Sequence, residues 1–312
     1  MNPLKNILDT LPLIILDGAF STELERRGCD LNDSLWSAKI LMENPEVIGA
    51  VHTDYFEAGA DCVITASYQA TYEGFMKRGL SEEQARELIQ LSIKIATKVR
   101  DAFWAKPENR INRPKPLVAA SVGPYGAYLA DGSEYRGDYT LDEAGLVAFH
   151  RKRLQTLIQA EPDILACETI PCLIEAQVIV GLMEENPGIC GWVSFSAKDG
   201  LHINSGEKIK DCARWLEGHE QVAAVGVNCT APEYVASLIA EIRKGTDKPV
   251  IVYPNSGEHY DADAKIWDGG STDFSYTEHA RNWFALGARV IGGCCRTTPQ
   301  DIRAIAAWAR NL

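Results

Sequence analysis

The chain has 312 residues, of which 46% are hydrophobic and 24% are charged, and its formal net charge is −12 with a pI near 5.0. An acidic surface repels nucleic acids and anionic membranes, so neither is an expected partner. The apolar run from Leu11 to Leu16 is too short for a signal peptide or a membrane helix, and we expect a cytoplasmic protein. Nine cysteines without a secretion signal indicate reduced thiols.

Eight short runs rich in Val, Ile, Leu and Ala recur along the chain, and each is followed by a loop and a helical pattern. The runs are LIILDG, DCVITAS, LVAASVG, DILACET, GWVSFS, AAVGVN, PVIVYPN and ARVIGG. Such continuous apolar character is typical of parallel strands that are covered on both faces. Alternation with helices predicts an α/β fold, a single (β/α)8 barrel domain over residues 1–312. A doubly wound sheet is the alternative, but no G-x-G-x-x-G motif follows the first run.

Three helix starts carry capping signals. Ser81 with Gln84 and Thr140 with Glu143 have the spacing of a capping box, and Thr298 offers an N-cap followed by proline. We therefore expect helices to begin at these three places.

Residues able to do chemistry stand at the ends of the apolar runs, where the active site of a barrel lies. They are Asp17, Thr65, Ser67, Glu168, Asn228, Cys229, Tyr253, Asn255, Cys294 and Cys295. Long loops also follow the runs, and the segment 123–139 (the 123–139 loop), rich in Gly and Tyr, is a candidate lid over the barrel mouth.

Cys229, Cys294 and Cys295, which we call the cysteine trio, are the clearest metal-binding pattern. Neighbouring strand residues point to opposite faces, so the adjacent pair can share an ion only if the backbone leaves strand geometry, which two preceding glycines permit. Three thiolates are a strong donor set for zinc, and a catalytic zinc keeps its fourth position open. His259 is the alternative fourth ligand, and otherwise a loop or substrate-contact residue.

The other central cysteines have a simpler interpretation. Cys62, Cys167, Cys190 and Cys212 lie in apolar stretches and are predicted to pack as small hydrophobic residues. A disulfide between the adjacent cysteines of the trio would be strained, and we do not expect it in cytosol.

Several segments together resemble the homocysteine S-methyltransferase family, in particular its bacterial and plant enzymes that use S-methylmethionine or S-adenosylmethionine. The segments are LDGAFSTELERRG, SVGPYGAYLADGSEYRGDY, DILACETIP, GVNCTAPE, VYPNSGEHYD and GGCCRTTP. The resemblance covers nearly the whole chain. It implies the same barrel and one zinc ion per chain, held by the cysteine trio.

The resemblance also implies which residues hold homocysteine. Asp17, the Gly18 and Ala19 backbone, and Glu168 would bind its amino and carboxylate ends. Without the resemblance, Asp17 is equally well explained as a helix cap and Glu168 as an ion partner in the barrel core. We add Asn228, at the end of the sixth run, as a further substrate contact.

The donor is expected to be a sulfonium compound. Trp36 is the leading aromatic contact for its positive charge, with helix packing as the alternative. In the betaine-using branch of the family, tyrosines occupy the positions of Gln69 and Thr169, so betaine is not expected here. The related cobalamin-dependent methionine synthases carry further domains after the corresponding module, whereas this chain ends soon after GGCCRTTP. No cobalamin is therefore expected.

The predicted reaction is zinc-dependent transfer of a methyl group from S-methylmethionine, or second from S-adenosylmethionine, to the thiolate of homocysteine, which forms methionine. Zinc would deprotonate the acceptor thiol, and binding would align the two sulfurs for in-line displacement. The alternatives are a zinc hydrolase with Glu168 as base and a non-enzymatic zinc-storing barrel. The sequence does not indicate the oligomeric state, and a monomer is compatible with it.

Overall fold

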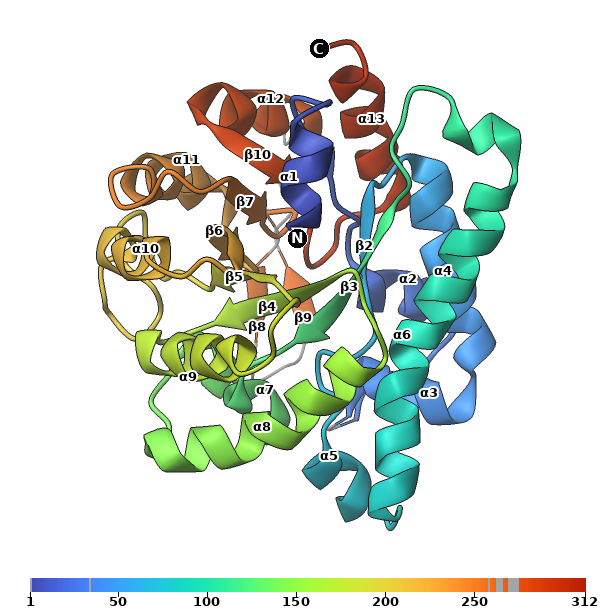
Figure 1. Cartoon of the computed structure of the whole chain (residues 1–312), viewed down its shortest axis with the longest axis vertical. Helices are drawn as coiled ribbons and strands as arrows, with labels where there is room; N and C mark the ends of the chain where they lie inside the picture. The colour runs from blue at the N-terminus through green and yellow to red at the C-terminus, as the bar shows by residue number, and fades with distance from the viewer. Residues whose placement is uncertain (1, 34, 258, 262–265, 269–274) are drawn as a thin grey trace.

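The computed structural model describes residues 2–33, 35–257, 259–261, 266–268 and 275–312, with only the backbone of 259–261 and 266–268. Eight parallel strands form one sheet in the order β1-β10-β7-β6-β5-β4-β3-β2. An isolated parallel bridge between Leu16 and Cys62 joins the first strand to the second, so the sheet curls into a nearly closed barrel. Helices surround the strands (Figure 1). The predicted (β/α)8 architecture is confirmed, and the doubly wound alternative is excluded.

The barrel strands coincide with the eight apolar runs. They are β1 (Ile14–Ile15), β2 (Cys62–Ile64), β3 (Leu117–Val122), β4 (Ile164–Ile170), β5 (Gly191–Phe195), β6 (Val222–Asn228), β7 (Val250–Tyr253) and β10 (Ala288–Ile291). A two-stranded antiparallel hairpin, β8 (His259–Asp261) and β9 (Ile266–Asp268), follows β7.

The helices fill the connections between the strands. They are α1 (Pro3–Leu8), α2 (Phe20–Arg26), α3 (Ile40–Glu43), α4 (Pro45–Ala58), α5 (Tyr72–Lys77), α6 (Glu82–Ala105), α7 (Tyr125–Leu129), α8 (Glu143–Gln159), α9 (Leu173–Glu184), α10 (Ile209–Glu217), α11 (Pro232–Ile242), α12 (Tyr276–Leu286) and α13 (Pro299–Ala309). Short 3₁₀ turns are η1 (Trp36–Lys39), η2 (Pro107–Arg110) and η3 (Ser133–Tyr135).

Two apolar layers explain why the strands are hydrophobic throughout. In β4, Ile164 and Ala166 pack in the cluster inside the barrel, whereas Leu165 and Cys167 pack in the cluster between strands and helices. Both faces are therefore removed from water, as parallel sheets require. Leu4 of α1 joins the interior cluster, so this helix covers one end of the barrel (Figure 1).

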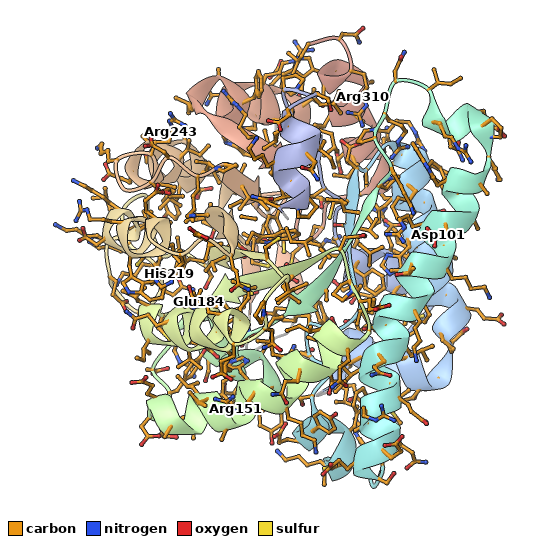
Figure 2. The ribbon with its side chains drawn as sticks, viewed as in Figure 1. Asp101, Arg151, Glu184, His219, Arg243 and Arg310 are labelled. Atoms are coloured by element: carbon orange, nitrogen blue, oxygen red, sulfur yellow. The ribbon has the colours of Figure 1, made fainter. Side chains whose placement is uncertain are left out.

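Many charged side chains lie on the outside of the helical layer. Figure 2 shows side chains such as Arg151 and Glu184 projecting from the outer helices, where Arg151 pairs with Glu185. No helix among the described residues is long and apolar enough to cross a membrane.

Two of the three predicted helix starts are confirmed, with capping boxes at Ser81 and Thr298. The third prediction was wrong by two residues, because helix α8 begins at Glu143. Its N-cap is Asp142, whose side chain accepts a hydrogen bond from the backbone N–H of Gly145 at 2.9 Å. The carboxylate closest to the helix is itself a strong cap and displaces Thr140.

Cys62, Cys167, Cys190 and Cys212 are buried and form no disulfide, as predicted.

Candidate metal centre and substrate site

The cysteine trio converges at the carboxyl ends of β6 and β10. The Sγ atom of Cys295 lies 3.7 Å from that of Cys229 and 4.0 Å from that of Cys294, and all three sulfurs lie within 4.8 Å of one another. Ligands at the zinc–sulfur distance of about 2.3 Å in a tetrahedron are about 3.8 Å apart. The trio therefore fits three corners of a tetrahedral zinc site, and no disulfide joins its members.

Two glycines give the chain the room to turn between β10 and the adjacent cysteines. A Cβ atom on Gly292 would lie 2.4 Å from the Cβ of Leu16, and one on Gly293 would lie 2.2 Å from Oγ1 of Thr297. Strand β10 already ends at Ile291, so Cys294 and Cys295 stand outside strand geometry, as their shared ligation requires. The hydroxyl of Thr297 donates to the carbonyl of Cys294 at 2.7 Å and fixes the turn.

Within the trio the thiols differ in acidity. Hydrogen bonds from Cys294 and Cys295 lower the pKa of the Cys229 thiol, and the Tyr135 hydroxyl also donates to it. Cys229 is therefore the first of the three to become a thiolate. Its backbone has a φ of 44°, in the left-handed region that non-glycine residues seldom occupy. Strained backbone of this kind is typical of functional sites.

Asp17 and Glu168, which we call the carboxylate pair, lie at the ends of β1 and β4 and are 2% and 7% exposed. Oδ2 of Asp17 accepts the backbone N–H of Ile64 at 2.8 Å, and Ser121 donates its hydroxyl to Glu168. Burial raises the pKa of Asp17 well above its ordinary value and that of Glu168 to about 7, and the negative charge of Cys229 adds to the second shift. Among the described residues neither carboxylate has an ion-pair partner, so the pair can accept a ligand's ammonium group.

Gly18 and Ala19 lie where β1 gives way to α2. The backbone N–H of Ala19 donates to Oγ1 of Thr297 at 3.0 Å, and its carbonyl accepts the Tyr55 hydroxyl at 3.0 Å. A Cβ on Gly18 would lie 2.8 Å from the same Thr297 oxygen. Both residues thus lock β1 against the turn that carries the adjacent cysteines, and their contact with homocysteine stays a prediction.

Asn228 is bonded within the barrel wall. Its Oδ1 accepts the backbone N–H of Thr169 at 2.7 Å and the hydroxyl of Ser194 at 2.8 Å, and its Nδ2 donates to Oγ1 of Thr169 at 2.7 Å. The side chain therefore ties the end of β6 to β5 and β4, next to Glu168 and Cys229 in the chain. One Nδ2 hydrogen is left, and the predicted substrate contact stays a prediction.

The 123–139 loop contributes two residues that the sequence alone did not single out. Tyr135 reaches Cys229, as described above, and Glu134 beside it interacts electrostatically with the same thiol. Burial raises the pKa of Glu134 to about 7. The loop was recognisable as a candidate lid, but no motif marked these two positions within it.

Trp36 is connected to the metal site through Tyr68. Its ring packs edge-on against Tyr68, with centroids 6.1 Å apart, and Tyr68 is in turn hydrogen-bonded to Thr169. Its contact with a sulfonium stays a prediction. Gln69 donates its side-chain amide to the carbonyl of Ala127 at 2.7 Å, so it ties the 123–139 loop to the barrel.

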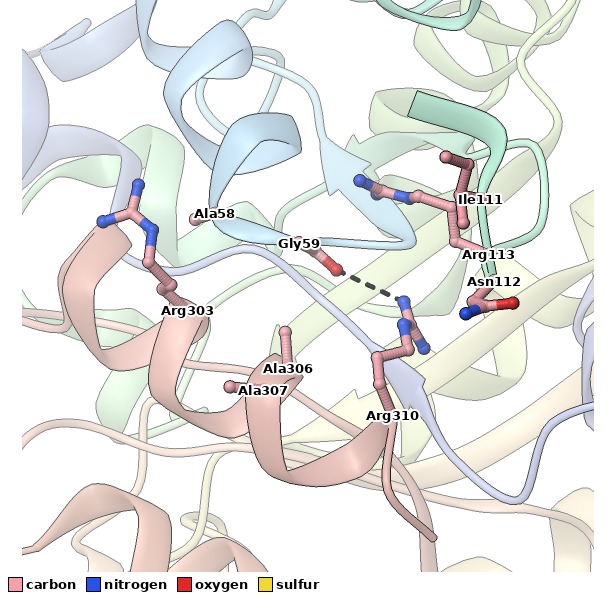
Figure 3. A pocket seen from close by; sticks show the side chains of 9 residues that line it. All are labelled: Ala58, Gly59, Ile111, Asn112, Arg113, Arg303, Ala306, Ala307 and Arg310. Atoms are coloured by element: carbon pink, nitrogen blue, oxygen red, sulfur yellow. Dashed lines mark hydrogen bonds between the residues drawn. The ribbon is translucent and has the colours of Figure 1, made fainter. Parts of the chain in front are cut away.

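The side chain of His259, the alternative fourth ligand, is outside the described residues. A pocket of about 370 Å³ lies at the opposite end of the barrel, where Gly59 precedes β2 and the end of α13 places Arg310 beside it (Figure 3). None of the predicted site residues lines that pocket.

Comparison with known proteins places this geometry in a family. The family model described as homocysteine S-methyltransferase matches residues 14–309. The chain belongs to the homocysteine S-methyltransferase family. The expected enzyme class, a methyltransferase, is thereby confirmed.

Two relatives align over almost their whole lengths. Homocysteine S-methyltransferase YbgG of Bacillus subtilis is 64% identical over 312 residues, which cover 100% of this chain and 99% of the relative. The homocysteine S-methyltransferase of Escherichia coli is 49% identical, and the alignment covers 98% of each chain.

Solved structures of the homocysteine methyltransferase MmuM from Escherichia coli share the fold. The oxidized form has a TM-score of 0.89 and 48% identity, covering 99% of this chain and 100% of that one. The metallated form has a TM-score of 0.88 and 47% identity, covering 98% and 100%. A metal in that relative agrees with the fit of the trio to a metal ion.

Proposed function

We propose that this protein transfers a methyl group from S-methylmethionine to the thiolate of homocysteine, with one zinc ion held by the cysteine trio. The observation that carries the proposal is the arrangement of three sulfurs at tetrahedral spacing beside two buried, unpaired carboxylates. Among the described residues the trio supplies three ligands and no fourth, and the carboxylate pair supplies a place for an amino acid. A thiol amino acid fits both at once.

The protein's residues orient the acceptor. The carboxylate pair would accept hydrogen bonds from the homocysteine ammonium, which restores the ionised form that burial disfavours. The cysteine trio would hold the zinc ion, which would supply Lewis-acid stabilisation of the homocysteine thiolate. Asn228 holds β4 and β6 at the spacing that sets the ammonium site relative to the trio.

The carbon–sulfur bond to the acceptor forms as the donor's methyl–sulfur bond breaks, and the electron pair of the broken bond remains on the donor sulfur. The methyl carbon needs no general base, so binding chiefly supplies alignment of the two sulfurs. Tyr68, Trp36 and Tyr135 would line the donor side with aromatic rings, which favour a sulfonium cation.

S-methylmethionine ranks above S-adenosylmethionine because nothing in the sequence resembles an adenosine site. Betaine ranks last, since Gln69 and Thr169 stand where the betaine-using branch has rings. Neither Gln69 nor Thr169 has an aromatic ring that could contact a quaternary ammonium group. In the structure the Gln69 side chain bonds to the 123–139 loop and the Thr169 side chain bonds to Asn228.

Turnover tests the proposal directly. Methionine formation is measured from homocysteine with S-methylmethionine, S-adenosylmethionine or betaine at equal concentration, with zinc present and thiols reduced. We expect the rates to fall in that order, with none for betaine. Betaine turnover at or above that of S-methylmethionine would overturn the donor assignment, and hydrolysis of either sulfonium donor without added thiol would support the zinc hydrolase instead.

A further inference from the structure

Glu134 is a partly buried acid that the reaction described so far does not use. It lies in η3, at the centre of the 123–139 loop, and its Oε2 atom is buried without a hydrogen-bond partner. Among the described residues it has no ion pair, since the nearby Arg136 pairs with Asp131 and Asp138. A buried carboxylate oxygen without a donor is costly, so a site that keeps one needs a partner from outside.

The chain fixes Glu134 in this position. The carbonyl of Glu134 accepts the Ser196 hydroxyl at 3.1 Å, which anchors η3 to the end of β5. A Cβ on Gly126 would lie 2.4 Å from the Glu134 nitrogen, so helix α7 packs closely on the same turn. Asp131 accepts the backbone N–H of Ser133 at 2.9 Å and sets the turn itself. These contacts fix the backbone that carries the Glu134 side chain.

Glu134 lies beside the metal site, next to Tyr68, which is proposed above to line the donor side. Glu134 interacts with Cys229 and with Tyr68, and its neighbour Tyr135 donates a hydrogen bond to Cys229. The carboxylate pair belongs to different elements, the ends of β1 and β4. The site therefore holds a second acidic group, separate from the one assigned to homocysteine, and the reaction has a second amino-acid substrate.

We propose that Oε2 of Glu134 accepts a hydrogen bond from the α-ammonium group of the methyl donor and makes the enzyme selective for donors that carry one. The inference rests on the proposed function. An unbonded oxygen needs a hydrogen-bond donor, which an ammonium group has and a sulfonium or quaternary ammonium lacks. The α-ammonium keeps its charge throughout methyl transfer, so this contact binds the donor without opposing the loss of charge at the sulfonium.

A matched pair of donors isolates the contact. S-methylmethionine and 4-(dimethylsulfonio)butyrate, which has the same skeleton without the amino group, are compared as methyl donors to homocysteine. We expect the wild-type kcat/KM to favour S-methylmethionine roughly 10- to 100-fold, the range for a hydrogen bond to a charged group. Glu134→Ala should abolish most of that preference by slowing S-methylmethionine alone, and Glu134→Gln, which keeps an acceptor but no charge, should lie between.

Controls separate this inference from the proposed function. Asp138→Asn removes a charge from an exposed position in the same loop and should leave the preference unchanged. Zinc content and the KM for homocysteine should be unchanged in both Glu134 variants, and thermal stability should not fall, because the free protein loses a costly unbonded oxygen. A wild-type preference that persists in Glu134→Ala would overturn the inference and leave the proposed function intact. A raised KM for homocysteine would instead assign Glu134 to the acceptor, and absence of wild-type turnover with either donor would overturn both.

Discussion

The Sγ atoms of Cys229 and Cys295 lie 3.7 Å apart although 66 positions separate the two residues in the chain. The parallel barrel makes this possible, because β7 lies between β6 and β10 and all three strands end at the same rim. The distance matches two corners of a zinc tetrahedron of about 3.8 Å edge.

Each cysteine of the trio is expected to be indispensable for the metal. Cys229→Ser, Cys294→Ser or Cys295→Ser should each lose zinc and methyl transfer, while circular dichroism shows the barrel still folded, because the trio stands at the rim and not in the core. Cys190→Ser, at the start of β5, should keep its zinc. Metal analysis of the purified variants decides, and full zinc with full activity in any trio variant would show that the ligand set is wrong.

Gly293 is expected to be irreplaceable by alanine. The added Cβ would lie 2.2 Å from Oγ1 of Thr297, so the turn holding the adjacent cysteines must shift. We expect a loss of about 1–3 kcal/mol in the free energy of unfolding, together with weaker zinc binding. Gly181→Ala is the matched control. No atom lies within 4 Å of its added Cβ in helix α9, and the free energy of unfolding should rise by up to about 1 kcal/mol. Equal zinc affinity in the Gly293 variant and wild type would contradict the packing argument.

Binding of the amino-acid end should depend on pH through Glu168, whose pKa is raised to about 7 by burial. Below that value the free carboxyl becomes protonated and no longer attracts an ammonium, so the Kd should rise with falling pH, approaching tenfold per unit. Homoserine, which lacks the thiol, removes the titration of sulfur from the measurement. Calorimetry at about pH 8 and about pH 6 compares wild type with Glu168→Gln. The variant should bind weakly with a flatter profile, and an equally steep profile in both proteins would assign the titration elsewhere.

The barrel fold could be predicted from the amino-acid sequence because each strand must bury both of its faces, and this requirement appears in the local residue pattern. Ile164 and Ala166 fill the barrel while Leu165 and Cys167 meet the helices, so β4 must be apolar on both faces before it reaches the rim. The convergence of the cysteine trio could also be predicted from the sequence, since all barrel strands end at the same rim. Glycines before Cys294 supplied the remaining condition, a departure from strand geometry.

Other site features depend on contacts between distant segments and could not be read from spacing. Glu134 reaches the site because η3 packs on Gly126 and bonds to Ser196, and neither contact leaves a local pattern. Asn228 stands at a strand end like a substrate ligand, yet three of its hydrogen bonds go to Thr169 and Ser194. A polar residue at the rim can either bond to neighbouring strands of the barrel or contact the substrate. The choice depends on the side chains that those strands present, which the residue's own segment does not reveal.

X-ray absorption at the zinc edge decides whether the metal binds homocysteine, because it counts the sulfurs around the metal before and after homocysteine is added. We expect about one zinc per chain with three sulfur ligands at about 2.3 Å in the free protein, and a fourth sulfur at a similar distance once homocysteine binds. A site already closed by four protein ligands, or a ligand set that homocysteine leaves unchanged, would contradict this expectation.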